Sequence, residues 1–206
     1  MPAAGTLFSY LAAFVTIVLA LGLTDLLTSL HRLLRHAAIV RWAALPLAAA
    51  LFILFALFSE FFTIWQLTLV SEVSFAGLFV HLLPTFFIFL AASAVLPDDI
   101  TGEEFDLDAF YFGNRRYLYL TLALAFAFDA PRNMLADPSD LEAIILGIAL
   151  PALILASVFV AMAFSRRRWV HWAGLAFVFA IVVLGFANHS ISAPAAAAGP
   201  SAESRR

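Results

Sequence analysis

The chain has 206 residues, of which 64% are apolar and only 12% charged, and its mean hydropathy is +1.01. Soluble domains are about half apolar and about a quarter charged, so this composition excludes an ordinary soluble domain and indicates that lipid is its solvent. The net charge of −3 points to no nucleic-acid partner, and the absence of cysteine excludes disulfides and thiolate metal sites.

Several segments are predicted to be membrane-spanning helices, since a span needs about 20 mainly apolar residues. In chain order the six segments are 7–27, 43–67, 75–96, 117–136, 141–164 and 169–187. The fourth is the weakest, because Asp129, Pro131 and Arg132 fall inside it. The predicted fold class is an all-α membrane protein, a six-transmembrane-helix bundle that forms a single domain over residues 1–191.

The arginines predict the orientation of these spans. All eleven basic residues are Arg, and eight fall on one side if six spans alternate: Arg32, Arg35, Arg41, Arg115, Arg116, Arg166, Arg167 and Arg168. Connections rich in Arg stay in the cytoplasm, so both termini are predicted to lie outside. The Lys-free, Ala-rich composition is typical of a GC-rich bacterial genome. We therefore predict a multi-pass protein of a bacterial inner membrane.

Three features are predicted outside the spans. The connection 97–116 mixes acids with aromatic residues, and we expect it to lie on the cytoplasmic membrane surface as an interfacial loop. Ser139, followed three residues on by Glu142, predicts a capping box at the start of the fifth span. The tail 192–206, rich in Ala, Pro, Gly and Ser, is predicted to be disordered.

Ionisable residues inside the spans are the candidates for a functional site, because each costs insertion energy and needs a polar partner. Glu60 lies in the second span and His81 in the third, at equal distances from the middle of the 67–75 connection. An antiparallel hairpin would therefore bring the two side chains face to face, roughly 10 Å below the outer surface.

Two further residues are predicted to reach the same depth. Asp129 lies in the fourth span, with Arg132 one turn away as an ion-pair partner, and His189 closes the sixth span. The candidates for an ion or proton site in the outer third of the bundle are therefore Glu60, His81, Asp129 and His189. A buried hydrogen bond that only fixes helix packing is the favoured interpretation, ahead of a proton or ion site and of a metal site.

A second set of polar residues lies at the predicted cytoplasmic side. Asp25, near the end of the first span, is expected to form a structural ion pair with Arg115 or Arg116. Three histidines lie among the arginines there and are expected to contact lipid headgroups: His31, His36 and His171.

The sequence has no motif of conventional enzyme chemistry, since HExxH, P-loop, GxSxG and Gly-rich dinucleotide patterns are all missing from it. We therefore expect no catalytic residue, no cofactor and no metal. The function hypothesis is a non-enzymatic scaffold or accessory subunit of a membrane assembly. The alternative is a small proton- or ion-linked transporter or channel that uses the outer Glu, His and Asp residues.

The expected partners are the lipid bilayer, including anionic lipids at the cytoplasmic face, with homo-oligomers and other membrane proteins left open. Two stretches carry a resemblance: LALGLTDLL at 19–27 running into LHRLLR at 30–35, and DLD at 106–108 followed by YF at 111–112 and RR at 115–116. They resemble an uncharacterised family of small multi-pass bacterial inner-membrane proteins. The resemblance implies a multi-pass fold and brings no activity, cofactor or catalytic residue with it.

Overall fold

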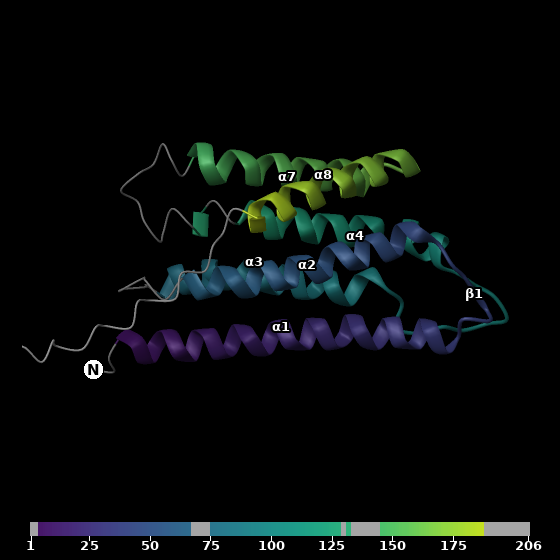
Figure 1. Ribbon diagram of the computed structural model, residues 1–206, viewed down its shortest axis with the longest axis horizontal. Coiled ribbons are helices and arrows are strands. Elements are labelled where there is room, and N and C mark those ends of the chain that lie inside the picture. Colours follow the sequence, from purple (N-terminus) through teal and green to yellow (C-terminus); the bar gives the residue numbers. More distant parts are fainter. Residues whose placement is uncertain (1–3, 67–74, 129–130, 133–144, 188–206) are drawn as a thin grey trace, which may run out of the picture.

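The computed structural model describes residues 4–66, 75–128, 131–132 and 145–187. This part of the chain is mostly helical. Its α-helices are α1 (Ala4–Arg35), α2 (Ala44–Gln66), α3 (Phe75–Val95), α4 (Leu107–Ala127), α7 (Leu150–Phe164) and α8 (Arg168–Ala187), and a short π-helix, η2 (Ile145–Ala149), leads into α7 (Figure 1).

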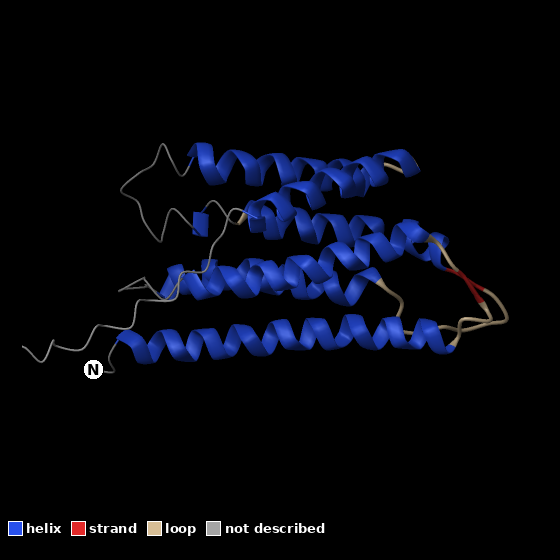
Figure 2. Ribbon diagram, in the orientation of Figure 1, coloured by secondary structure: helices blue, strands red, loops and turns tan. Residues whose placement is uncertain are grey.

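The helices run side by side along the long axis of the molecule (Figure 1). The connections α1–α2, α3–α4 and α7–α8 lie toward the same end, which we call the arginine end. There a two-residue strand, β1 (Val40–Arg41), pairs in parallel with β2 (Phe105–Asp106), as Figure 2 shows in red. The chain thus alternates in direction, and the arginines in or near these three connections gather at one end.

Three of the described helices are long and apolar enough to cross a membrane: Ala12–Arg35, Ala44–Thr63 and Ile145–Phe164. Two shorter apolar helical stretches accompany them, Phe79–Val95 and Arg168–Leu184. Many large apolar side chains of these helices are exposed, as expected of helices that face lipid. The structure is therefore that of a helical protein compatible with a membrane-embedded position.

The helix α4 differs from the predicted fourth span. It begins at Leu107 and ends at Ala127, whereas the sequence predicted 117–136. Its first turns belong to the segment 97–116 that was expected to lie on a surface as a loop, yet Tyr111 is only 1% exposed. The expected loop is therefore helical from Leu107 onward, and its polar residues interrupt the apolar run by which a buried helix face is recognised in a sequence.

The start of α4 is defined by a local capping interaction. The carboxylate of Asp106 accepts a hydrogen bond from the backbone N–H of Ala109 at 2.9 Å, which satisfies one of the free donors of the first turn. This bond lowers the pKa of the Asp106 carboxyl below its usual range, and the nearby charge of Arg41 lowers it further. The predicted capping box at Ser139 and Glu142 lies outside the described residues.

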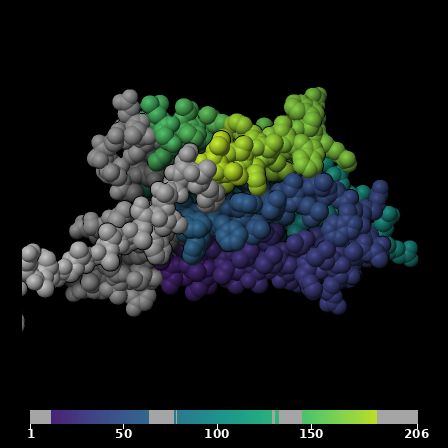
Figure 3. Space-filling model, in the orientation of Figure 1, coloured from purple at the N-terminus to yellow at the C-terminus, as the bar shows by residue number. Residues whose placement is uncertain are grey.

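The core sits where α4 passes between α3 and α7, with α8 covering α2. Phe159 of α7 is fully buried, stacks on Tyr119 of α4 at 6.1 Å between ring centroids, and lies 5.7 Å from Phe52 of α2. Figure 3 shows one face of the molecule, on which α7 and α8 lie above α2 and α1. Aromatic contacts therefore join helices from both halves of the chain.

The contact between α7 and α8 depends on a glycine. A Cβ atom added to Gly174 would lie 2.4 Å from the sulfur of Met162, which is fully buried. Small residues at helix interfaces allow this kind of close approach.

Candidate functional site: the Glu60–Arg132 network

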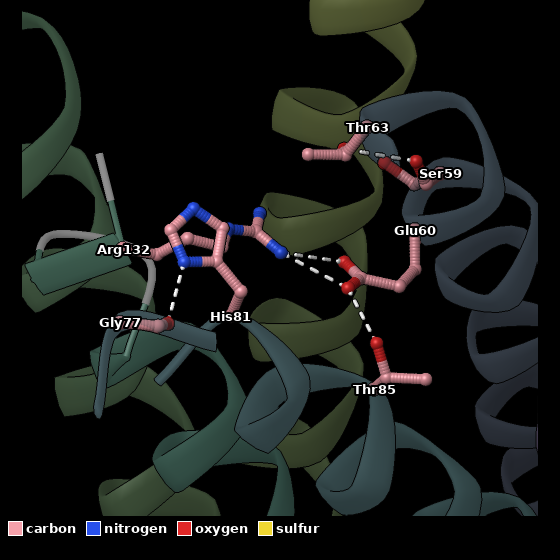
Figure 4. Close-up of polar contacts among 7 residues, drawn as sticks. All are labelled: Ser59, Glu60, Thr63, Gly77, His81, Thr85 and Arg132. Carbon is pink, nitrogen blue, oxygen red and sulfur yellow. Dashed lines mark hydrogen bonds and ion pairs between the residues drawn. The ribbon is translucent and has the colours of Figure 1, made fainter. Parts of the chain in front are cut away.

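Three segments contribute to a buried polar network around Glu60, whose residue is 4% exposed (Figure 4). Nη1 of Arg132 donates hydrogen bonds to both carboxylate oxygens, at 2.9 and 3.1 Å. The hydroxyl of Thr85 donates to Oε1 at 2.8 Å. Glu60 belongs to α2, Thr85 to α3, and Arg132 follows α4, so the network ties these three segments together.

The predicted pairing of Glu60 with His81 is replaced by other bonds. Within the described residues the carboxylate is bonded to Arg132 and Thr85, and Thr85 is one helical turn further along α3 than His81. A symmetric connection between the two helices would have placed Glu60 opposite His81. The observed register is displaced by one turn, and a third segment supplies the counter-charge.

His81 is buried, with 6% of the residue exposed, and its two ring nitrogens differ (Figure 4). Nδ1 lies 2.8 Å from the carbonyl oxygen of Gly77, one turn back on α3. Because a carbonyl only accepts, Nδ1 carries the hydrogen. Nε2 has no hydrogen-bond partner among the described residues, and in the neutral ring it presents a lone pair.

A small space borders the carboxylate. Its volume is about 50 Å³, and its polar lining comes from Ser59, Glu60, Thr63 and Arg132. The hydroxyl of Thr63 is itself bonded to the Ser59 carbonyl at 3.0 Å. The space is polar and large enough to hold water. His81 does not line it.

The other two members of the predicted outer cluster, Asp129 and His189, lie outside the described residues. In the part that the structure describes, no group of three or more His, Cys, Asp or Glu side chains has a geometry that fits a metal ion.

The predicted ion pair of Asp25 with Arg115 or Arg116 is not formed. Nε of Arg115 donates to the Ser165 carbonyl at 3.0 Å, and Nη1 donates to the Phe112 carbonyl. The guanidinium of Arg116 lies over a phenylalanine ring of α7 instead of beside a carboxylate. The physical reason is the packing order, because α3 lies between α1, which carries the aspartate, and α4, which carries both arginines.

His171 was expected to contact lipid headgroups, and the structure corrects this, because its residue is 0% exposed. Nε2 lies 3.1 Å from the Ser165 carbonyl, so Nε2 carries a hydrogen in that bond. In the neutral ring, Nδ1 accepts from the Tyr111 hydroxyl at 2.8 Å, and Tyr119 is hydrogen-bonded to Tyr111. We call these three residues the Tyr–Tyr–His chain.

One feature of the sequence indicates the Tyr–Tyr–His chain. Tyr111 and Tyr119 are eight residues apart, a spacing that places side chains on the same face of a helix. The predicted loop ends at residue 116, so Tyr111 and Tyr119 fall into two different predicted elements. Their common helix face is therefore missing from the prediction.

The comparisons with known proteins give no relative. No protein-family model matches the chain, and neither a curated protein nor a solved structure matches it. The class is therefore defined by the fold and the network alone: a helical protein with three described helices able to span a membrane, held together inside by a buried ion pair.

Proposed function

We propose that this chain is a multi-pass protein of a bacterial inner membrane, with six spans and both termini outside. The gathering of the α1–α2, α3–α4 and α7–α8 connections at the arginine end supports this layout (Figure 1), because Arg-rich connections remain cytoplasmic. The fifth and sixth spans correspond to η2 with α7 and to α8, and the fourth starts within α4.

Within that membrane we propose a non-enzymatic role, as a scaffold or an accessory subunit of a membrane assembly. One observation carries the proposal: the oxygens of Glu60 already accept hydrogen bonds from Arg132 and Thr85. A carboxylate used for transport needs to exchange protons or ions with water. The space beside Glu60 is small, about 50 Å³, so the network fits a role in fixing helix positions.

In this role the protein would contact its partner through the surface of the helix bundle. Large apolar side chains are exposed along it, including Phe58 and Phe61 of α2 and Leu153 of α7. Such surfaces face lipid or the helices of another membrane protein.

The test is proton flux in liposomes, driven by a potassium diffusion potential and read with an internal pH dye. Wild type and Glu60→Gln are expected to give the same flux as protein-free vesicles. Flux above that background in wild type, lost in Glu60→Gln, would remove the scaffold proposal. Isolation of the chain in native nanodiscs adds a second readout, a partner in fixed stoichiometry.

A second candidate function is a small proton- or ion-linked transporter, favoured by the buried lone pair at Nε2 of His81. Imidazole nitrogens serve as proton shuttles in proteins. The same assay addresses it with His81→Gln beside Glu60→Gln. Flux that depends on His81 and not on Glu60 would establish the second candidate and reject the first.

A further inference from the structure

Four arginines line a cleft at the arginine end of the molecule. Arg115 and Arg116 come from α4, and Arg166 and Arg168 from the turn between α7 and α8 and the first residue of α8. The cleft has a volume of about 570 Å³, and Asp108, Phe112 and Gly113 complete its lining. We call it the arginine cleft.

Carboxylates neutralise only part of this positive charge. Arg168 forms an ion pair with Asp108 at 2.6 Å. Arg115 is bonded to backbone carbonyls, which carry no formal charge. Arg116 lies 5.5 Å from the ring centroid of Phe164. Within the described residues Arg116 and Arg166 have no carboxylate partner, so three positive charges of the arginine cleft remain without a counter-ion.

The cleft is preorganised for an anion. Arg115, Arg116 and Arg166 carry like charges and line the same cleft, so a bound anion would reduce the repulsion between them. Arg115 is held in place because its residue is 6% exposed and two of its nitrogens are bonded. The cleft also contains the N-terminus of α8, at Arg168, where the helix dipole favours negative charge.

Aromatic side chains locate the cleft relative to a membrane. Tyr117, Trp169 and Trp172 are exposed close to it along α4 and α8. Exposed Trp and Tyr residues gather at the level of lipid headgroups. The arginine cleft therefore lies where the phosphates of a bilayer would lie if these helices span it.

We propose that the arginine cleft is a binding site for a phosphate group, and that the phosphate of an anionic phospholipid headgroup is its ligand. Guanidinium groups match the geometry and charge of phosphate oxygens. The volume exceeds that of a phosphate ion alone and leaves room for the glycerol part of a headgroup. This site is separate from the Glu60–Arg132 network, so the inference holds for either candidate function.

The chain offers a matched pair of variants for the test. Arg166 lines the cleft, whereas its neighbour Arg167 is exposed in the same turn and does not line it. Arg166→Gln and Arg167→Gln therefore remove the same charge at adjacent positions. Both side chains are exposed, so neither change disturbs a buried contact.

The first experiment tests the lipid as the ligand. The full chain is released from nanodiscs that contain equal amounts of phosphatidylglycerol and phosphatidylcholine. Native mass spectrometry then gives the ratio of the two bound lipids. Wild type is expected to retain phosphatidylglycerol preferentially. Arg166→Gln is expected to lower this ratio about tenfold, the effect of losing one charge-assisted hydrogen bond to the phosphate. Arg167→Gln is expected to keep the wild-type ratio.

In the soluble arm, the midpoint of thermal unfolding is measured in detergent with inorganic phosphate and with chloride at equal ionic strength. A phosphate-specific rise that Arg166→Gln abolishes, without any lipid preference, supports the phosphate site and overturns the lipid as its source. Equal effects of Arg166→Gln and Arg167→Gln in both arms, or no effect of either, would overturn the site itself.

Discussion

At the scale of single residues, the charge of Glu60 has the largest expected effect on stability. Glu60→Gln keeps the size of the side chain and removes the negative charge that faces Arg132, both residues being almost fully buried. Breaking one side of a buried ion pair costs about 3 kcal/mol. The free energy of unfolding, measured by SDS titration in mixed micelles, is expected to fall by that amount.

Thr85→Val is the matched control for this change, because it removes only the hydroxyl that donates to Glu60. A single hydrogen bond is worth about 1 kcal/mol, so Thr85→Val is expected to cost clearly less than Glu60→Gln. Equal losses for the two variants would show that the ion pair with Arg132 contributes nothing beyond an ordinary hydrogen bond.

The Tyr–Tyr–His chain permits a comparison between its middle and its end. Tyr111→Phe removes the hydroxyl that bonds both Tyr119 and His171, so a buried imidazole nitrogen loses its donor. We expect a loss of about 2 kcal/mol, against about 1 kcal/mol for Tyr119→Phe, which removes one bond at the end. Thermal unfolding in detergent measures both, and a larger loss at Tyr119 would contradict the placement of Tyr111 in the middle of the chain of hydrogen bonds.

The sequence predicts the burial of Glu60 and does not predict its partner. The cost of burying a carboxylate predicts that Glu60 faces the interior, and the structure has it buried. The identity of its partner depends on the packing of a third segment, which carries Arg132. That packing follows from contacts between helices, and no local spacing in the sequence encodes it.

At the scale of helices, the close approach of α7 to α8 is sensitive to one methyl group. Gly174→Ala places a Cβ against the buried side chain of Met162, and overpacking of this kind costs about 2 kcal/mol. Gly147→Ala is the matched control, since a Cβ there meets no atom of the described residues outside its own helix within 4 Å. Its unfolding temperature is expected to stay unchanged or rise slightly. Equal responses of the two variants would contradict the proposed contact.

The cap at the start of α4 predicts a pH dependence. The hydrogen bond from Ala109 lowers the folded-state pKa of Asp106, so the stability contributed by the carboxylate is present above its unfolded pKa and is lost as pH falls through the lower folded value. Asp106→Ser keeps a capping oxygen without the charge. The difference in unfolding temperature between wild type and Asp106→Ser is expected to shrink as pH falls below about 4. A constant difference would exclude this linkage.

The predicted helices agree with the structure where they are apolar throughout. The segments 43–67, 75–96 and 169–187 correspond to α2, α3 and α8 with small shifts at their ends. Prediction failed for α4, because Asp108, Asn114 and Arg116 interrupt any apolar run in its first turns. A helix of this kind is recognised by the spacing of its buried residues. The mean hydropathy over a window of residues does not retain that spacing.

At the scale of the whole molecule, the proposed layout is open to a direct chemical test. The chain has no native cysteine, so each single-cysteine variant carries one thiol. A membrane-impermeant maleimide is expected to label Ser201→Cys, in the predicted tail, from outside intact cells. Arg167→Cys, in the α7–α8 turn, is expected to react only in inverted membranes. Labelling of Arg167→Cys in intact cells would reverse the proposed orientation.

The pairing of β1 with β2 has a consequence for the biogenesis of the chain. The N–H of Phe105 donates to the carbonyl of Ile39 at 2.8 Å, and the two strands are parallel. A parallel pair requires a long crossover, which here consists of α2 and α3. The strand β1 emerges early from the ribosome. It has no partner strand until α2 and α3 have both left the translocon. The two strands therefore pair late in the synthesis of the chain. Their pairing requires that α1, α2 and α3 have already been inserted in the correct order.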